Sequence, residues 1–281
     1  MKKTILLFAL ALIGYTSYAQ KHSCCQPAAT EAFAMLGAKS DFQSAHLAPE
    51  PISFEPSTGK MITFKTNGGK DGNAFQVNSA SPSNHYLYVF HEWWGLNDHI
   101  KKETEELAAA LPGVNVIAVD LYDGKIATNA EEAGATMQAV RKERAESLIL
   151  GAYEIAGKSA SIQTIGWCFG GGWSLQAAML AGTKNIGCVM YYGMPEKEES
   201  KLKALNAPVL GIFATQDGWI NKPVVDAFET QMKQLNKAIT IHWYDAEHAF
   251  ANPSNPKFNK DAASDAMTKS IAFIKSNFLQ R

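Results

Sequence analysis

The sequence lacks an excess of charge of either sign. Its 26 lysines and arginines nearly balance 27 aspartates and glutamates, which leaves a formal net charge of −1 over 281 residues. Proteins that hold nucleic acid or an anionic membrane through surface charge usually carry a basic excess, so the composition gives no reason to expect either partner. Internal repeats and low-complexity tracts are also missing. Together with the ordinary apolar content, this predicts one sizeable domain, which we expect to be monomeric.

Two frequent cofactor motifs are missing as well. The glycines at positions 170–172 are not followed by a Lys-Ser/Thr pair, so they do not form a phosphate-binding P-loop. His91-Glu92 begins like a zinc-protease motif, but Gly95 stands where the second histidine would be, and the pair follows a predicted strand instead of lying on a helix. We therefore predict neither a metal ion nor an organic cofactor.

Long apolar runs are scarce, and the one at the N-terminus is too short to span a bilayer. Lys2-Lys3 precede the apolar residues 5–13, and small residues occupy positions 17 and 19. This pattern is typical of a secretory signal peptide cleaved after Ala19, with a retained anchor as the alternative. We expect residues 1–19 to be removed and the mature protein to be exported, periplasmic or secreted, with no membrane attachment.

Cysteine is scarce, with four residues in all. An even count in an exported protein usually suggests disulfides, but Cys188 lies in an apolar run and is expected to be a buried thiol. Cys24 and Cys25 are adjacent in an N-terminal tail. They could bridge to each other or to another chain, or bind a metal together with His22, although these three residues make an incomplete tetrahedral set.

From residue 85 onward, short apolar runs alternate with amphipathic stretches, which predicts a mostly parallel sheet covered by helices on both faces. The predicted strands are 85–91, 114–121, 162–165, 186–192, 208–214 and 239–244. The predicted helices are 97–111, 130–156, 171–181, 223–235 and 260–278. Residues 61–65 and 73–78 predict an antiparallel hairpin. Residues 20–60 form an extension with a helix-like patch at 30–39, and residues 61–281 form the α/β domain.

No Gly-x-Ser-x-Gly occurs in the chain, but residues 166–170 read Gly-Trp-Cys-Phe-Gly. This pentapeptide follows a predicted strand and precedes a predicted helix. A strand, a glycine-pinched turn and a helix form the nucleophile elbow of α/β hydrolases, here with sulfur in place of the usual oxygen. Cys168 is therefore a candidate nucleophile that must remain a free thiol.

Two further residues follow Cys168 in the order that α/β hydrolases use. Asp217 comes directly after the strand at 208–214, and His248 comes after the strand at 239–244. In the order nucleophile, acid, histidine, His248 would move the proton and Asp217 would fix the imidazole tautomer. Glu92 also follows a predicted strand. All four residues are expected at the carboxyl edge of the sheet, where α/β proteins bind ligands.

From about residue 61 to residue 278, the chain resembles the dienelactone hydrolases (carboxymethylenebutenolidases). The resemblance rests on residues 91–96, 120–122, 166–171, 191–193, 216–217 and 248–251. It implies a Cys168-Asp217-His248 triad. It also implies that Glu92 interacts with the resting thiol and helps to deprotonate it when substrate enters.

The sequence departs from this family where substrate carboxylates are bound. Family members that cleave dienelactone place an arginine shortly after the catalytic histidine, whereas this chain has Asn252. Those family members have a second anion-binding arginine on the helix before the elbow. In this chain, either Arg141 or Arg144 could correspond to it. Loss of a guanidinium removes a bidentate clamp for a carboxylate, so the resemblance extends to the catalytic residues but leaves the substrate open.

The remaining site predictions concern the oxyanion and the pocket. The amide of Phe169 opens the elbow helix and is the expected first oxyanion donor, with the amide of Trp93 as the second. Aromatic side chains flank these positions and suggest an apolar pocket wall. The predicted pocket residues are Trp167, Trp219, Tyr192 and Asn252, with Trp93 as a further candidate.

We therefore expect an exported hydrolase that cleaves a small-molecule ester or lactone through a thioester on Cys168. A peptidase or other acyl hydrolase, or a thiol-redox protein, could use the same scaffold. A redox role would need a resolving thiol, and Cys188 has no obvious access. A non-catalytic ligand-binding protein is the third alternative, although a binder has no need for a complete triad.

Overall fold

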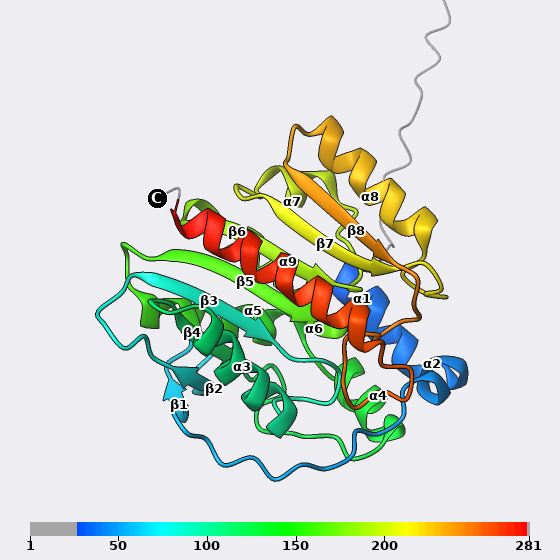
Figure 1. The fold of residues 1–281 in the computed structure, drawn as a ribbon, viewed down its shortest axis with the longest axis horizontal. Coiled ribbons are helices and arrows are strands. Elements are labelled where there is room, and N and C mark those ends of the chain that lie inside the picture. The colour runs from blue at the N-terminus through cyan, green and yellow to red at the C-terminus, as the bar shows by residue number, and fades with distance from the viewer. Residues whose placement is uncertain (1–26, 280–281) are drawn as a thin grey trace, which may run out of the picture.

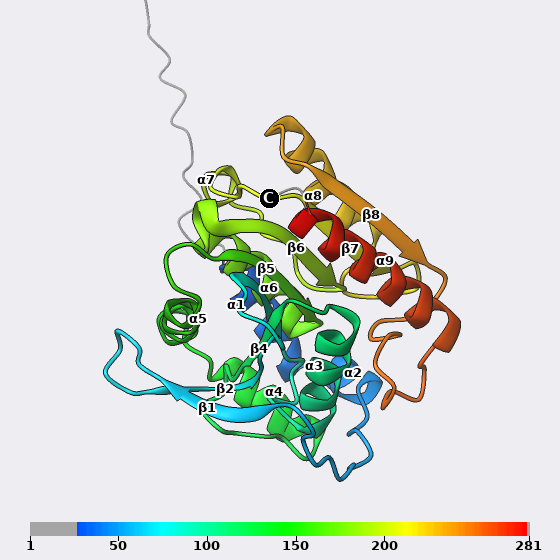
Figure 2. The same ribbon diagram turned by 60° about the vertical axis from the view of Figure 1, so that its left-hand side comes forward.

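The computed structural model describes residues 27–279, which fold around one twisted sheet with helices on both faces (Figures 1 and 2). Within these residues the sheet has eight strands in the order β1-β2-β4-β3-β5-β6-β7-β8. The β1/β2 and β2/β4 pairs are antiparallel and all other neighbours are parallel. The strands are β1 (Lys60–Phe64), β2 (Gly72–Val77), β3 (His85–Phe90), β4 (Asn115–Val119), β5 (Ser161–Trp167), β6 (Asn185–Tyr191), β7 (Val209–Ala214) and β8 (Ile239–Tyr244).

Helices α3 and α9 cover one face of the sheet, and α5 and α6 cover the other (Figures 1 and 2). Helix α8 packs against the edge strand β8. The helices are α1 (Ala29–Ala34), α2 (Ser40–Ala45), α3 (Asp98–Ala110), α4 (Ala130–Gln138), α5 (Lys142–Ala156), α6 (Phe169–Leu180), α7 (Glu199–Lys203), α8 (Lys222–Gln234) and α9 (Lys260–Leu279), with short 3₁₀ helices η1 (Met35–Ala38) and η2 (Gly182–Lys184).

The predicted α/β-hydrolase fold is confirmed, including the antiparallel hairpin at the start of the sheet. The central strands β4, β6 and β7 are buried along their whole length. Strands covered on both faces need apolar side chains on both, which explains why these segments are continuous apolar runs and were recognisable in the sequence.

The helical region predicted at 130–156 is two helices and not one. Helix α4 ends before Ala139, and Arg141 has an extended backbone with φ −85° and ψ 130° before α5 begins. The amide of Ala139 still bonds to the carbonyls of Ala135 and Thr136, so the first helix closes with its own hydrogen bonds before the chain turns. Neither glycine nor proline occurs at this break, which is why the sequence did not reveal it.

Helix α6 begins at Phe169, two positions before the predicted start at residue 171. Glycines 170–172 are poor helix formers, so the sequence favoured a later start. Tertiary packing overrides this preference, because a Cβ at Gly170 would lie 2.1 Å from the carbonyl oxygen of Phe90 in β3. The glycine lets the first turn of α6 approach the neighbouring strand.

The described part of the N-terminal extension covers the carboxyl edge of the sheet. Helix α1 packs on α6, and η1 packs on α4. Phe33 and Phe42 from this segment are fully buried, so the segment is part of the packed core at that edge. The predicted signal peptide and Cys24-Cys25 lie outside the described residues. No helix of the described part of the chain is long and apolar enough to cross a membrane.

Candidate active site

Cys168 occupies a strained turn between β5 and α6. Its backbone has φ 55° and ψ −118°, a conformation that costs a non-glycine residue roughly 1–3 kcal/mol and is found mostly at functional sites. A Cβ at Gly166 would lie 2.1 Å from the carbonyl oxygen of Gly170, so the glycines on either side of the turn have no space for a side chain. The amide of Cys168 donates to the carbonyl of Tyr191 at 3.0 Å, which anchors the turn to β6.

Asp217 and His248 lie together at the ends of β7 and β8. Nδ1 of His248 is 2.6 Å from Oδ2 of Asp217, while Oδ1 accepts from the amides of Trp219 and Ile220 at 2.8 Å each. Burial alone would raise the pKa of Asp217, but His248 and the two amides hold it below its ordinary value. Burial alone would likewise lower the pKa of His248, but Asp217 and then Cys168 raise it to about 10. The pair therefore favours a protonated imidazole beside an ionised carboxylate.

The thiol of Cys168 is 1% exposed and lies beside this pair. Burial raises the pKa of Cys168 above its ordinary value, which the neighbouring carboxyl of Glu92 reinforces and which His248 and the amide of Phe169 oppose. Burial disfavours the thiolate because a charge loses its hydration in a low-dielectric site. The resting side chain of Cys168 is therefore a thiol, which a neighbouring base would have to deprotonate before the sulfur could act as a nucleophile.

Glu92 is the candidate for such a base. Burial raises its pKa to about 7, although His248 and the side-chain amide of Asn252 lower it. Asn252 donates to Oε2 of Glu92, and Oε1 has no hydrogen-bond partner among the described residues. The preceding residue, His91, orients this loop: its Nδ1 lies 2.6 Å from the carbonyl of Glu92, and its Nε2 accepts from the amide of Leu121 at 3.1 Å. His91 is thus a fully hydrogen-bonded buried residue that positions Glu92.

A cleft with about 600 Å³ of free space opens beside Glu92. Its walls include Trp94, Trp167, Asn252 and Glu103. No lysine or arginine is among the described residues that line it. The cleft therefore combines an apolar aromatic wall with carboxyl and amide groups, which suits an uncharged organic molecule.

The sequence matches the dienelactone hydrolase family over residues 73–278. The chain belongs to the dienelactone hydrolase family. Among its relatives, carboxymethylenebutenolidase 1 of Cupriavidus pinatubonensis is 25% identical over 233 residues, which cover 78% of this chain and 96% of that protein. Protein usf of Aquifex pyrophilus is 25% identical over 231 residues, covering 77% of this chain and 98% of that protein. As a family member, the protein is a carboxylic ester hydrolase.

Solved structures support the same fold. A dienelactone hydrolase-like promiscuous phosphotriesterase from metagenomic libraries superposes with a TM-score of 0.68 at 19% identity, covering 78% of this chain and 99% of that one. The dienelactone hydrolase from Anabaena variabilis gives a TM-score of 0.56 at 18% identity, with 78% and 98% covered. At these identities the likeness shows the fold alone.

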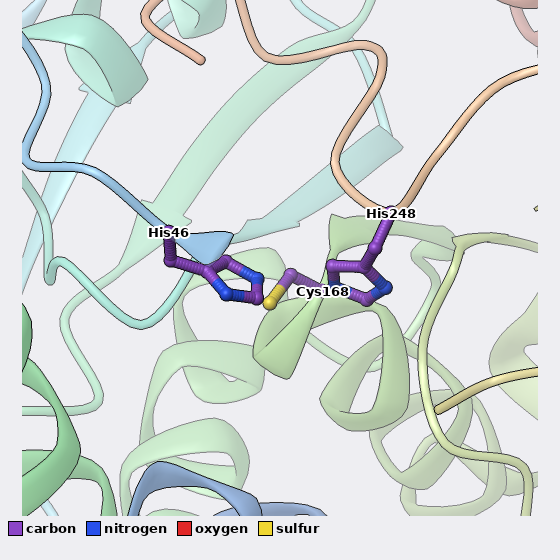
Figure 3. A group of neighbouring side chains, drawn as sticks. All are labelled: His46, Cys168 and His248. Carbon is purple, nitrogen blue, oxygen red and sulfur yellow. The ribbon is translucent and has the colours of Figure 1, made fainter. Parts of the chain in front are cut away.

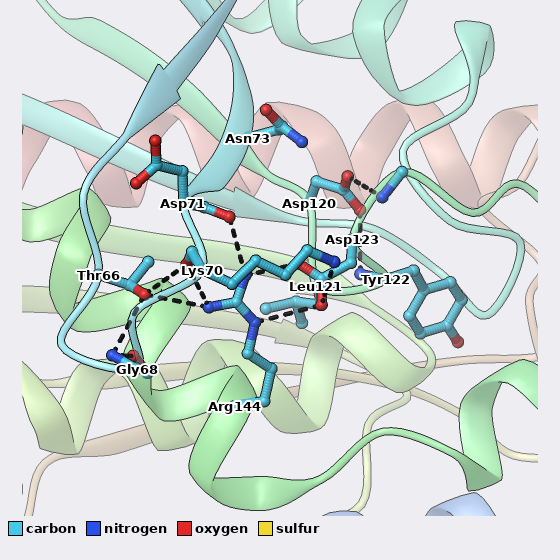
Figure 4. Close-up of polar contacts among 12 residues, drawn as sticks. Thr66, Gly68, Lys70, Asp71, Asn73, Asp120, Leu121, Tyr122, Asp123 and Arg144 are labelled. Atoms are coloured by element: carbon cyan, nitrogen blue, oxygen red, sulfur yellow. Dashed lines mark hydrogen bonds and ion pairs between the residues drawn. The ribbon is translucent and has the colours of Figure 1, made fainter.

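Neither arginine that we considered as a family-type anion binder lines the cleft. Arg144 instead forms an ion pair with Asp123, at 2.6 Å from Nη2 to Oδ1, and donates to Thr66 and to the carbonyls of Lys70 and Asp71 (Figure 4). All three guanidinium nitrogens of Arg144 thus hold the β1–β2 hairpin against the loop after β4. Arg141 occupies the N-cap position of α5 without a side-chain capping bond, and it does not line the cleft either.

The predicted pocket residues of this family member fall into two groups. Trp167 and Asn252 line the cleft. Trp93, Trp219 and Tyr192 do not line it. The rings of Trp219 and Tyr192 lie 5.8 and 5.0 Å from the ring of His248, and Trp93 is fully buried. Trp219 and Tyr192 thus pack around His248, whereas Trp93 packs on His46 with ring centroids 5.0 Å apart.

His46 is the site residue that our sequence analysis missed. It ends α2, is 5% exposed, and its ring centroid lies 5.1 Å from that of His248. The sulfur of Cys168 lies between the two imidazoles, and the potential donor atoms of the three side chains are within 4.8 Å of one another (Figure 3). Phe42 stacks on His46 with ring centroids 4.1 Å apart. No motif signalled His46, because it belongs to the extension and is brought to the site only by tertiary packing.

The protonation of His46 follows from its contacts. Its Nδ1 lies 2.6 Å from the carbonyl of Phe42, and since a carbonyl can only accept, Nδ1 carries the proton. Burial, with the neighbouring His248, lowers the pKa of His46 to about 3. His46 is therefore neutral, and its Nε2 offers a lone pair. That Nε2 has no hydrogen-bond partner among the described residues, and the same is true of Nε2 of His248 and of the Tyr192 hydroxyl.

Proposed function

We propose that the protein hydrolyses an uncharged ester or lactone through a thioester on Cys168. The observation that carries this proposal is the 2.6 Å contact between His248 and Asp217 beside a cysteine held in a strained elbow. An imidazole oriented by a buried carboxylate, next to a nucleophile, is the arrangement that acyl transfer requires. A non-catalytic binder has no use for the strain at Cys168.

The acylation half of the reaction uses the protonation states described above. Glu92 takes the proton of the thiol as substrate enters, and the thiolate of Cys168 attacks the carbonyl carbon. The amide of Phe169, at the start of α6, and the amide of Trp93 stabilise the oxyanion. When the tetrahedral adduct collapses, the protonated His248 gives its proton to the departing alkoxide, which leaves a thioester and a neutral imidazole.

Deacylation restores the site. Neutral His248 takes a proton from water as the water oxygen attacks the thioester, and Asp217 stabilises the resulting imidazolium. Collapse of the second adduct breaks the carbon–sulfur bond and releases the carboxylic acid. Protonated Glu92 then returns its proton to the thiolate of Cys168. The balance is one ester and one water consumed, and one acid and one alcohol released.

The lining of the cleft supports an uncharged acyl or alcohol group. Carboxyl groups of Glu92 and Glu103 face it, and Arg144 is committed to Asp123. A substrate carboxylate would be desolvated there without a cationic partner. This distinguishes the chain from an enzyme that binds its substrate through an arginine clamp.

A panel of aryl esters and lactones tests the proposal. Wild-type protein should turn over neutral esters, Cys168→Ala should be inactive, and mass spectrometry of stalled wild type should find the acyl group on Cys168. A matched pair, such as 4-nitrophenyl butyrate and the corresponding 4-nitrophenyl hemisuccinate, tests the charge preference. Equal turnover by Cys168→Ala would refute the nucleophile, and preference for the hemisuccinate would refute the uncharged substrate.

We also propose that the protein is exported. The support is the sequence of residues 1–19, which lie outside the described residues. N-terminal sequencing of protein recovered from the periplasmic or culture fraction should begin at Gln20. Recovery from the cytoplasm with residues 1–19 intact would refute export.

A further inference from the structure

We propose that His46, Cys168 and His248 form a reversible zinc site that binds the nucleophile and switches the hydrolase off. Zinc binding concerns the three donor atoms and stands whether or not the thiol is the nucleophile. The inhibitory consequence rests on the proposed function.

The donor set has the chemistry that zinc selects. One thiolate and two imidazole nitrogens are borderline-soft ligands, and three protein ligands with an open fourth position are typical of exchangeable zinc sites. His46 is neutral with its lone pair on Nε2, because its Nδ1–H donates to the carbonyl of Phe42. His248 is held through Nδ1 by Asp217. In each case Nε2 is the ring nitrogen without a hydrogen-bond partner among the described residues, and that of His248 becomes a ligand when zinc displaces its proton.

The supporting contacts match those of metal-binding histidines. A histidine ligand usually donates its second ring nitrogen to a carbonyl or carboxylate, which fixes the ring orientation and the tautomer. Here Phe42 supplies the carbonyl and Asp217 supplies the carboxylate, each at 2.6 Å. Both imidazoles are therefore oriented before any metal arrives.

The spacing is close to that of a metal site. The three donor atoms are within 4.8 Å of one another, whereas tetrahedral zinc with its usual bond lengths separates its ligands by roughly 3.3–3.7 Å. A contraction of about 1 Å closes the difference. His46 can supply it because it follows the last residue of α2 and leads into the loop before β1, while Cys168 and His248 are held by the sheet.

Burial of His46 argues against a purely structural role. A buried polar atom without a partner destabilises the fold, and apolar side chains surround this imidazole: Phe42, Trp93 and Trp219. A phenylalanine or leucine would fill the same space without leaving Nε2 unpaired. A ligand that uses this lone pair explains why the site keeps a histidine.

Zinc would also link the N-terminal segment to the catalytic loops. Coordination requires the Cys168 thiol and the His248 imidazolium each to release a proton to solvent. Zinc then occupies the sulfur and Nε2 of His248, so neither attack nor proton transfer remains possible. It would also fix α2 over the elbow through His46. Hydrolysis would fall in proportion to zinc occupancy and return when a chelator removes the metal.

The test is to titrate the full chain with zinc and to monitor binding by calorimetry or by competition with a chromophoric chelator. The titration uses a Cys24→Ser/Cys25→Ser background, which removes the tail thiols. We expect one zinc per chain. His46→Ala should weaken binding by about 100-fold or more, because loss of a direct ligand should cost at least as much as loss of a supporting residue, about 10–100-fold. His242→Ala removes a histidine of β8 outside this cluster and should bind zinc as the background does.

Cobalt substitution gives a second readout that does not depend on turnover. Cobalt bound to the unsubstituted site should show a sulfur-to-metal charge-transfer band that disappears in Cys168→Ser, and X-ray absorption of the zinc form should show one sulfur and two imidazoles. Failure to bind zinc, an unchanged affinity in His46→Ala, or a metal shell without sulfur would each overturn the proposal. If zinc binds as expected but no ester is hydrolysed, the zinc site stands and the proposed hydrolysis falls.

Discussion

Replacing Asp217 by asparagine tests the central pair of the site with little change in shape. Oδ1 of the aspartate accepts from the amides of Trp219 and Ile220, and the asparagine oxygen can keep both bonds, so the fold should persist. The asparagine nitrogen then faces Nδ1 of His248, where the carboxylate oxygen was. Two donors would face each other, so the imidazole gives up its Nδ1 proton and stays neutral with its proton on Nε2, where it can no longer take a proton from water.

The size of the effect follows from the charge on His248. Asp217 is the largest of the influences that raise the pKa of His248 to about 10, against an ordinary value of 6.5 and against the lowering effect of burial. Loss of that carboxylate lowers the pKa of His248 and removes its stabilisation of the imidazolium. Replacing the acid of a comparable triad by its amide lowers kcat by about 10⁴, so kcat should fall by about 10³–10⁴ here.

The assay is steady-state hydrolysis of the best neutral ester in the panel, with thermal unfolding measured in parallel. Asp245→Asn is the matched control, because Asp245 is exposed on the neighbouring loop and accepts only from the side chains of Thr215 and Gln216. The control should retain wild-type activity. A kcat for Asp217→Asn within tenfold of wild type, in a folded protein, would refute the assignment of Asp217.

Three further changes test separate parts of the structure. Glu92→Gln should remove a pH-dependent destabilisation of the wild type. Burial raises the pKa of this carboxyl to about 7 from 4.5, so its ionisation lowers the stability of the wild type increasingly as pH rises from about 4.5 to 7. The free energy of unfolding at pH 8 relative to pH 4 should therefore favour the variant by about 3 kcal/mol, and parallel pH–stability curves would contradict this. Gly170→Ala should destabilise the fold by about 3 kcal/mol or more, because its Cβ would lie 2.1 Å from the carbonyl oxygen of Phe90. Gly172→Ala is the control and should be neutral or stabilising, because the nearest atom to its Cβ would be 3.4 Å away. Equal denaturation midpoints for the two variants would refute the close approach at Gly170. Phe42→Ala should cost about 3–5 kcal/mol of packing and speed alkylation of the thiol by iodoacetamide, and an unchanged alkylation rate would show that the segment does not shield Cys168.

The site residues that could be predicted from the sequence are those that belong to short local sequence patterns. A glycine-flanked cysteine between a strand and a helix implies a strained elbow, and the structure gives Cys168 a positive φ. Asp217 and His248 follow buried apolar strands, and parallel strands bring their carboxyl ends to one edge. Arg144 shows where this reasoning fails. Its charge and its position before the elbow suited an anion site, but its partners Asp123 and Thr66 are distant in sequence and could not be inferred.

His46 marks the physical limit of prediction from this sequence. Its segment begins as a short helix of ordinary composition, and nothing in its spacing distinguishes a covering segment from a linker. Its position depends on Phe33 and Phe42, whose burial against the enzyme body is decided by shape and not by a pattern within the segment. Once those rings are packed, the carbonyl of Phe42 accepts from Nδ1 of His46 and fixes its tautomer. Nε2 of His46 is then left without a hydrogen-bond partner among the described residues. A segment that served only to fill space would not need a histidine at this position. His46, which the sequence could not assign, is therefore the residue that most directly links the N-terminal extension to the thiol of Cys168.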